Sequence, residues 1–253
     1  MTLHVHEFGP ADGRPVVFLH GLSGYGGRWR PLAEQQLTDF RVLAPDLRGH
    51  GESTRLPPWT LEQHADDVLD VLDSLGLERV PLVGHSYGGA TAMHVAAREP
   101  ARIERLALLD PAIGLSPAMC AEAAEGELAR PTWPDLDSAR SFFAGFRPAS
   151  AVEVEVPANL VHTDGRWHLR YSAAMAVTAW SEMARPPALP PRGMPLLLLP
   201  ATKADFVAPE LVAALRDRLG DDLTVREVDA GHQLQFERSE EVGALLREFL
   251  CQA

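Results

Sequence analysis

The stretch Gly-His-Ser-Tyr-Gly-Gly at residues 84–89 is the feature that most constrains how this chain can fold. It follows an apolar run at residues 80–83 and precedes small residues suited to a helix. A Gly-x-Ser-x-Gly pattern between a strand and a helix is typical of a tight turn that holds a serine, here Ser86, at its tip. Because strand and helix backbones nearly touch at such a turn, the positions two residues away on each side must lack bulk, and Gly84 and Gly88 meet that need. The same pattern also occurs as an ordinary glycine-rich turn, so it needs support from other motifs.

This turn would also place the backbone N–H of Tyr87 at the start of a helix. Unpaired amides and the helix dipole favour a developing negative charge at that point. The sequence therefore predicts one of the two donors of an oxyanion hole at Tyr87.

Length and composition limit the classes of protein to consider. A chain of 253 residues suffices for one α/β domain, or for a core domain with an inserted cap, and 46% apolar with 23% charged residues is ordinary for a globular protein. The formal net charge of −12 would repel phosphate backbones and anionic lipid, so we expect neither nucleic acid nor a membrane as a partner. We expect a monomer or a homodimer.

The two cysteines, Cys120 and Cys251, are too few for a disulfide framework and lack metal-ligand spacing. The first residues lack the basic start and apolar core of a signal peptide, and the longest apolar run is too short to span a membrane. These features predict a cytoplasmic protein.

Strand and helix patterns alternate along most of the chain. Residues 3–8 and 15–19 predict a strand hairpin, and further strands are expected at residues 41–44, 80–83, 103–109, 196–199 and 223–228. A helix is expected from Thr60, with Gln63 completing a capping box. The alternation stops at residues 112–193, where tryptophans, phenylalanines and prolines gather. We therefore expect an α/β core of residues 1–111 and 194–253, with a mostly parallel sheet flanked by helices, and a mainly helical cap insertion at residues 112–193.

The opening of the chain admits an alternative interpretation as a dinucleotide-binding unit. Gly24 and Gly26 could be the first two glycines of the Gly-x-Gly-x-x-Gly pattern, and Asp46 ends the next strand. The third position of the pattern falls on Trp29, whose bulk would prevent close packing of the helix on the strand. The pattern therefore favours a different use of this loop.

Several motifs together resemble those of the α/β-hydrolase superfamily. They are His-Gly after the early strand, Asp-Leu-Arg-Gly-His-Gly-Glu-Ser at residues 46–53, the turn at Ser86, an acid after the leucine-rich strand, and Ala-Gly-His at residues 230–232. Ser86, Asp205 and His232 follow successive strands in the order serine, acid, histidine, which is the order of this fold.

The resemblance implies a role for each of these residues. Ser86 would be the nucleophile, His232 its base, and Asp205 the carboxylate that orients the imidazole. Asp110 is the alternative acid, because it also ends a strand and some members of the superfamily place their acid there. The second oxyanion donor would be the backbone N–H of Leu22.

Other histidines and aromatic residues have less specific signals. The histidines beside the site, His20 and His85, and His50 in the 46–53 segment are interpreted as packing or supporting residues. His4 and His6 alternate on a strand, but two imidazoles without a third ligand are weak evidence for a metal, so we predict no metal and no organic cofactor. The candidates for a substrate pocket are Trp29, Phe143 and Trp180, although such side chains also pack caps onto cores.

The function that the resemblance implies is hydrolysis of a small-molecule carboxylic ester through an acyl-serine intermediate. The same triad also serves thioesters, lactones, carbon–carbon bond hydrolysis and cofactor-free perhydrolysis, and the fold does not separate these reactions. A serine at position 86 argues against the members that use an aspartate nucleophile. A small-molecule receptor on a hydrolase scaffold is the alternative from a different class.

Overall fold

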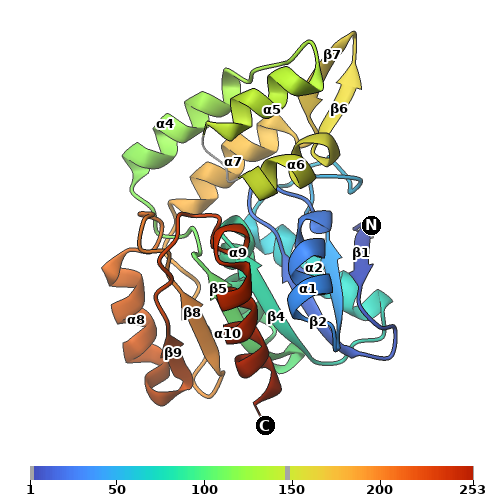
Figure 1. The fold of residues 1–253 in the computed structure, drawn as a ribbon. Helices are drawn as coiled ribbons and strands as arrows, with labels where there is room; N and C mark the ends of the chain where they lie inside the picture. The colour runs from blue at the N-terminus through green and yellow to red at the C-terminus, as the bar shows by residue number, and fades with distance from the viewer. Residues whose placement is uncertain (1–2, 146–148, 253) are drawn as a thin grey trace.

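The computed structural model describes residues 3–145 and 149–252. Within these residues, seven strands form one sheet in the order β1-β3-β2-β4-β5-β8-β9 (Figure 1). The strands are β1 (Val5–Phe8), β2 (Arg14–Leu19), β3 (Phe40–Pro45), β4 (Val80–His85), β5 (Ile103–Leu109), β8 (Leu196–Leu199) and β9 (Leu223–Val225). β1 is antiparallel to β3, and the other neighbouring pairs are parallel. The expected mostly parallel sheet flanked by helices is confirmed.

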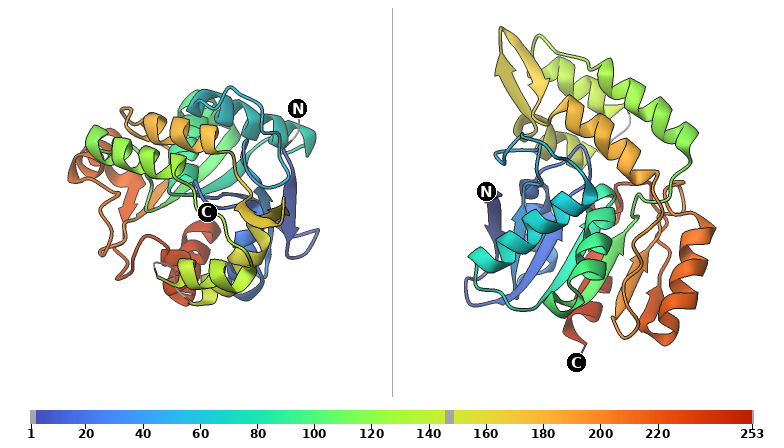
Figure 2. Two further views of the ribbon diagram at one scale, coloured as in Figure 1. Left: turned by 90° about the horizontal axis from the view of Figure 1, so that it is seen from above. Right: turned by 180° about the vertical axis from the view of Figure 1, so that it is seen from behind.

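Helices cover both faces of this sheet, as strands that are buried on both sides require (Figures 1 and 2). One face packs against α2 (Leu61–Ser74), α3 (Tyr87–Arg98) and α8 (Pro209–Leu219), and the other against α1 (Arg30–Gln36) and α10 (Ser239–Cys251). Shorter helical segments connect the main elements: η1 (Gly26–Trp29), η2 (Pro100–Arg102), η3 (Gly220–Asp222) and α9 (Leu234–Glu237). Successive strand residues alternate between the two apolar layers, so Val17 packs on the α2 side and Val16 on the α10 side.

Helix α2 begins where its sequence signal predicts. The hydroxyl oxygen of Thr60 accepts a hydrogen bond from the backbone N–H of Gln63, 3.2 Å away, which satisfies one of the free donors of the first turn. The Gln63 side chain donates to Asp67 instead of returning to Thr60, so only half of the expected capping box forms.

The expected hairpin between residues 3–8 and 15–19 is wrong. β1 pairs with β3, with Val5 opposite Pro45 and Phe8 opposite Val42, and β3 lies between β1 and β2. The reason is burial: β3 is apolar and is covered on both faces, whereas β1 is partly exposed and suits the edge of the sheet.

The chain between β5 and β8 lies beyond one end of the sheet (Figure 1). It contains α4 (Pro117–Leu128), α5 (Leu136–Ala144), α6 (Ala149–Ala158), β6 (Leu160–Thr163), β7 (Arg166–Leu169) and α7 (Ala173–Met183). The segment is mostly helical, and the antiparallel pair β6–β7 was not expected from the sequence. The N–H of Ser172 donates to the carbonyl of Gly49 at 2.8 Å, so the segment contacts the loop that follows β3. Across the described residues, no helix has both the length and the apolar character needed to cross a membrane.

Candidate active site

Ser86 occupies a strained turn between β4 and α3. Its backbone angles are φ 56° and ψ −122°, a region that residues with a side chain rarely adopt. A Cβ atom on Gly84 would lie 2.4 Å from the carbonyl oxygen of Gly88, and one on Gly88 would lie 2.4 Å from that of Leu19. Both glycines are therefore required by the close approach of the backbones, as the motif predicted.

The register of the sheet brings Asp110 beside Ser86. In the parallel pair β4–β5, His85 lies opposite Leu109, so the next residue of each strand emerges at the same edge. The backbone N–H of Ser86 donates to the carbonyl of Leu109 at 3.1 Å, which ties the two turns together.

His232 joins these two side chains into one hydrogen-bonded chain. Its Nε2 lies 2.8 Å from the Ser86 Oγ, and its Nδ1 lies 2.6 Å from the Asp110 Oδ2. The arrangement assigns the proton to Nδ1, which donates to the carboxylate and leaves Nε2 free to accept from the serine hydroxyl. The loop between β9 and α9 that carries His232 is held by a hydrogen bond from the N–H of Gly231 to Glu237.

Asp110 is fully buried and held on several sides. Its Oδ1 accepts from the backbone N–H of Ala201 at 3.0 Å, and its own N–H donates to the carbonyl of Leu199 at 2.9 Å. Its φ of 44° turns the chain sharply at the end of β5. The carboxylate therefore has a fixed orientation toward His232.

Asp110, and not Asp205, is the acid that contacts His232, which corrects the expectation from the sequence. Asp205 is exposed and lies in the loop after β8, one strand further from Ser86 than Asp110. The same loop contributes a different group, because the ring of Phe206 stacks on His232 with centroids 3.9 Å apart and planes at 22°. The position of Asp205 after the leucine-rich strand was misleading, because register, and not the presence of an acid after a strand, decides which carboxylate reaches the imidazole.

Ser86 and His232 open onto a cavity of about 150 Å³ between the core and the segment at residues 112–193. Its apolar wall includes Trp180, Met183 and Phe206, and Glu127 is among its polar groups. Of the three aromatic residues expected at a pocket, Trp180 lines this cavity. Met183 and Phe206 were missed, because nothing in the sequence distinguished them from packing residues.

The other two aromatic candidates lie elsewhere. Trp29 is fully buried on the α10 side of the sheet, where its ring contacts Phe18 with centroids 5.0 Å apart. Phe143 belongs to a small apolar cluster within residues 112–193 and lines a neighbouring hollow. The indole of Trp29 therefore packs the core, as the alternative interpretation of these aromatics held.

His85, which lines the cavity, and His50, which contacts Leu22, lie outside the hydrogen-bonded chain of Ser86, His232 and Asp110. His85 donates from Nε2 to the backbone carbonyl of His232 at 2.7 Å. Burial, and next the charge of His232, hold the pKa of His85 well below its usual value. Burial also lowers the pKa of His50 to about 4, and His50 contacts the carbonyl of Leu22. The neutral forms of these rings act as hydrogen-bonding supports.

His20 sets the orientation of the peptide that carries the Leu22 N–H. Its Nδ1 lies 2.8 Å from the carbonyl oxygen of Gly21, which belongs to the same peptide unit. Because C=O and N–H point in opposite directions across a trans peptide, this contact turns the Leu22 N–H away from His20. Leu22 lines the cavity, and Tyr87 opens α3, so its N–H has no acceptor within the helix.

The alternative of a dinucleotide-binding loop does not fit this geometry. Asp46 is 1% exposed, and its carboxylate accepts hydrogen bonds from the backbone N–H groups of Gly26 and Glu52. The acid is thus committed to holding loops together, and Trp29 fills the core where a third glycine would be needed.

Comparison with known proteins agrees with this architecture. Residues 14–193 match the family model described as the alpha/beta hydrolase fold. Lipase LipV of Mycobacterium tuberculosis is 37% identical over 257 residues, which cover 99% of this chain and 98% of that protein. The 3-oxoadipate enol-lactonase 1 of Acinetobacter baylyi is 37% identical over 101 residues, covering 40% of this chain and 38% of that protein.

Solved structures match along the whole chain. The structure of E-2-(acetamidomethylene)succinate hydrolase superposes with a TM-score of 0.85 at 22% identity, over 99% of this chain and 95% of that one. A marine microorganism esterase superposes with a TM-score of 0.83 at 23% identity, over 98% and 99% of the two chains. At these identities the likeness concerns the fold, whereas the family match and the lipase similarity concern the sequence itself. The chain belongs to the α/β-hydrolase fold family.

Proposed function

We propose that this protein hydrolyses small-molecule carboxylic esters through an acyl intermediate on Ser86. The observation that carries the proposal is the hydrogen-bonded chain from Ser86 through His232 to Asp110, with its serine end open to a cavity. A serine hydroxyl is a weak nucleophile at neutral pH, and a base held in the correct tautomer by a buried carboxylate makes it reactive. The similarity to a lipase supports the same reaction class.

In the proposed reaction, the Ser86 Oγ attacks the ester carbonyl while His232 Nε2 takes the hydroxyl proton. His232 then gives this proton to the leaving alcohol, and Asp110 stabilises the imidazolium that forms in between. Water, activated by the same imidazole, attacks the acyl-serine and releases the carboxylic acid. Each step uses the two contacts of His232, at 2.8 Å and 2.6 Å.

The backbone N–H groups of Tyr87 and Leu22 would stabilise the oxyanion of the tetrahedral intermediate. Tyr87 supports this role because it starts α3, and Leu22 because the His20–Gly21 contact orients its peptide. Each such donor contributes on the order of 10² to 10³ in rate.

The shape of the cavity favours esters with short acyl groups. It is only about 150 Å³, and Trp180, Met183 and Phe206 close its apolar side. Because Trp180 and Met183 belong to α7, we propose that residues 112–193 act as a cap that completes the substrate site. The net charge of −12 supports a small molecule rather than a nucleic acid as the substrate.

The test is hydrolysis of p-nitrophenyl acetate, butyrate and octanoate by the wild type and by Ser86→Ala. We expect the wild type to show an initial burst, to prefer acetate or butyrate, and to lose activity by orders of magnitude in Ser86→Ala. Full activity in Ser86→Ala would refute the acyl-serine route.

Two further measurements separate the alternatives that share this site. Rates of hydrolysis of lactones and thioesters, compared with those of the esters at equal concentration, test the other reactions of the triad. Tight retention of a ligand with one slow turnover would favour a receptor, whereas fast repeated turnover favours the enzyme.

A further inference from the structure

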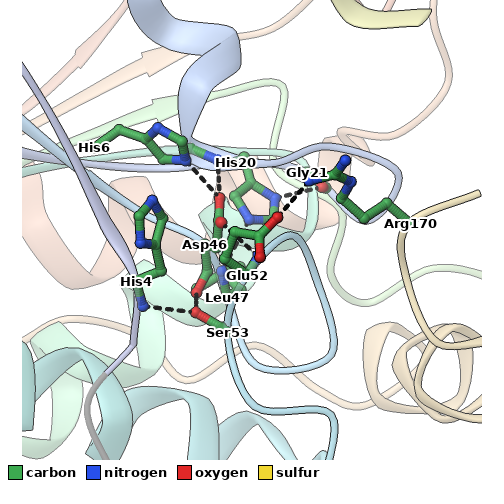
Figure 3. Close-up of polar contacts among 10 residues, drawn as sticks. His4, His6, His20, Gly21, Asp46, Leu47, Glu52, Ser53 and Arg170 are labelled. Atoms are coloured by element: carbon green, nitrogen blue, oxygen red, sulfur yellow. Dashed lines mark hydrogen bonds and ion pairs between the residues drawn. The ribbon is translucent and has the colours of Figure 1, made fainter. Parts of the chain in front are cut away.

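Three side chains that commonly bind metal ions meet at the edge strand β1, outside the active-site cavity (Figure 3). His4 and His6 are alternate residues and therefore point to the same face of the strand. Asp46 follows β3 directly, and its backbone N–H donates to the carbonyl of His4 at 2.8 Å, so the two residues are cross-strand neighbours. The antiparallel β1–β3 pairing thus gathers all three side chains on one surface.

The potential ligand atoms lie near one another. The Nε2 of His6 lies 3.1 Å from the Oδ1 of Asp46, and one nitrogen or oxygen from each of the three residues falls within 4.8 Å of the others. Two ligand atoms 3.1 Å apart, each about 2.0–2.1 Å from an ion, subtend an angle of roughly 100° there, between the octahedral and tetrahedral values. The rings of His4 and His6 meet edge to face with centroids 4.7 Å apart. The exposed His4 ring would turn toward the other two residues on binding, because ligand atoms about 2.0–2.1 Å from one ion lie at most about 4.2 Å apart.

Asp46 is held in place by groups that leave one ligand position open to His6 or to a metal. Its Oδ1 accepts from the N–H of Gly26 at 2.6 Å, and its Oδ2 accepts from the N–H of Glu52 at 2.9 Å. A carboxylate oxygen has two acceptor positions, so the second position on Oδ1 faces His6.

The two histidines differ in how firmly they are placed. The ring of His6 contacts the ring of Tyr25 edge to face at 5.8 Å and stacks beside Phe8 at 6.3 Å. His4 is exposed, which provides a path from solvent. The backbone of His4 is fixed nonetheless, because its N–H donates to the Ser53 Oγ at 2.9 Å, and that hydroxyl donates to the Asp46 carbonyl.

We propose that His4, His6 and Asp46 bind a divalent transition-metal ion such as Zn²⁺, with water completing its coordination. Two imidazoles and one carboxylate suit Zn²⁺ and other divalent first-row transition-metal ions, whereas Ca²⁺ and Mg²⁺ prefer oxygen ligands alone. The ion would take the place of the hydrogen bond between His6 and Asp46. It would bind Nε2 of the neutral His6 ring, whose hydrogen would then lie on Nδ1. This proposal departs from the sequence prediction of no metal, which rested on the lack of a third ligand.

An ion at this position would tie the edge strand to the end of β3. Asp46 also anchors the N–H of Gly26, the first residue of η1, and the loop at Glu52. Binding should therefore raise the melting temperature of the protein, because an ion that binds only the folded state stabilises it. The site does not include Ser86, so we expect Ser86→Ala to bind the ion as the wild type does.

The experiment is a titration of tag-free, chelator-treated protein with ZnCl₂ by calorimetry, and with CoCl₂ by visible absorption, which reports nitrogen and oxygen ligands. The variants are His4→Ala and His6→Ala. The matched control is His162→Ala, which removes an exposed histidine from β6. Ser86→Ala is titrated in parallel.

We expect one equivalent of Zn²⁺ to bind the wild type, His162→Ala and Ser86→Ala with the same affinity and to raise their melting temperatures. His4→Ala and His6→Ala should each bind at least about tenfold more weakly, since even second-shell changes at metal sites cost 10-fold to 100-fold. Equal binding by the two variants and the wild type, or no binding by the wild type, would overturn the proposal. Loss of binding in His162→Ala would place the ion elsewhere and would overturn it as well.

Discussion

The backbone N–H of Leu47 donates to the Nε2 of His20 at 2.9 Å, and this contact decides which nitrogen of the ring carries the proton. With Nε2 accepting, Nδ1 must hold the hydrogen and donate to the Gly21 carbonyl. Burial, and next the charge of His50, keep the pKa of His20 well below its usual value, so the ring stays neutral. A residue at the start of the 46–53 loop thus orients the proposed oxyanion donor at Leu22.

His20→Asn and His20→Gln form a matched pair that tests this role. The asparagine amide can occupy the position of Nδ1 and still donate to Gly21, whereas the glutamine amide reaches the position of Nε2. We expect His20→Gln to lower kcat by about 10² with little change in KM, because the donor acts on the transition state, and His20→Asn to retain more activity. The measurement is the steady-state kcat and KM of both variants on p-nitrophenyl butyrate. An equal decrease in kcat in the two variants would contradict the prediction.

Asp110→Asn should remove most of the activity while Asp205→Asn leaves it unchanged. The amide at position 110 cannot accept the Nδ1 proton as a carboxylate does, and it favours the wrong tautomer of His232; in serine proteases the equivalent change lowers kcat by about 10⁴. Asp205 is exposed and serves as the control. Comparison of kcat for the two variants is the measurement, and a larger loss in Asp205→Asn would return the role to that residue.

The protein should lose stability as the pH falls below about 6.5, the usual pKa of histidine. Burial lowers the pKa of His50 to about 4 and that of His64 to about 3. At pH values between the folded and the unfolded pKa, the histidine is protonated in the unfolded state and neutral in the folded state. Each such group therefore lowers the free energy of unfolding by on the order of 1 kcal/mol per pH unit in this range, and it has no such effect above the unfolded pKa.

His64→Leu isolates one of these contributions. Both ring nitrogens of His64 lack a hydrogen-bond partner within the described residues, and the ring packs edge-on against Tyr87. We expect urea unfolding at about pH 7.5 and about pH 5.5 to show a smaller drop in stability for His64→Leu than for the wild type, by on the order of 1 kcal/mol. An identical drop in both proteins would show that this histidine does not titrate in the unfolding reaction.

Arg48→Met should destabilise the fold by about 3–5 kcal/mol, because it leaves the buried carboxylate of Asp67 without its charge partner. The guanidinium binds Asp67 through two hydrogen bonds of 2.6 Å, and the two side chains are 7% and 2% exposed. The control is Arg98→Met, whose partner is Asp66 on the surface and whose loss should cost at most about 1 kcal/mol. The measurement is the free energy of unfolding of both variants by denaturant. Similar decreases in the two variants would contradict the prediction that the buried ion pair matters more than the exposed one.

Local sequence signals predicted the features that depend on neighbouring residues. The strained turn at Ser86 needs glycine at positions 84 and 88, and a Cβ at either one would collide with backbone. Thr60 marked the start of α2 for a similarly local reason, since its hydroxyl caps an amide three residues ahead. The order of strands and helices along the core and the family resemblance followed from such signals and are confirmed.

Pairing between distant strands could not be predicted in the same way. Whether Asp110 or Asp205 meets His232 depends on which strand lies beside β4 and in what register, and both acids follow apolar strands. Likewise the wall of the cavity depends on how α7 and the loop after β8 lie relative to the core, so Met183 and Phe206 had no signal that distinguished them from packing residues.

The sequence by itself therefore determined the turn at Ser86, the α/β alternation and the membership of a family, because steric demands and hydrophobic periods act over a few residues. Only the tertiary structure decided that Asp110 contacts His232 and that Asp46 joins His4 and His6. Both outcomes follow from strand neighbours and register, which are set by burial of the whole sheet. The arrangement of the strands in the sheet, and not the residues next to a carboxylate in the chain, decides which side chain that carboxylate contacts.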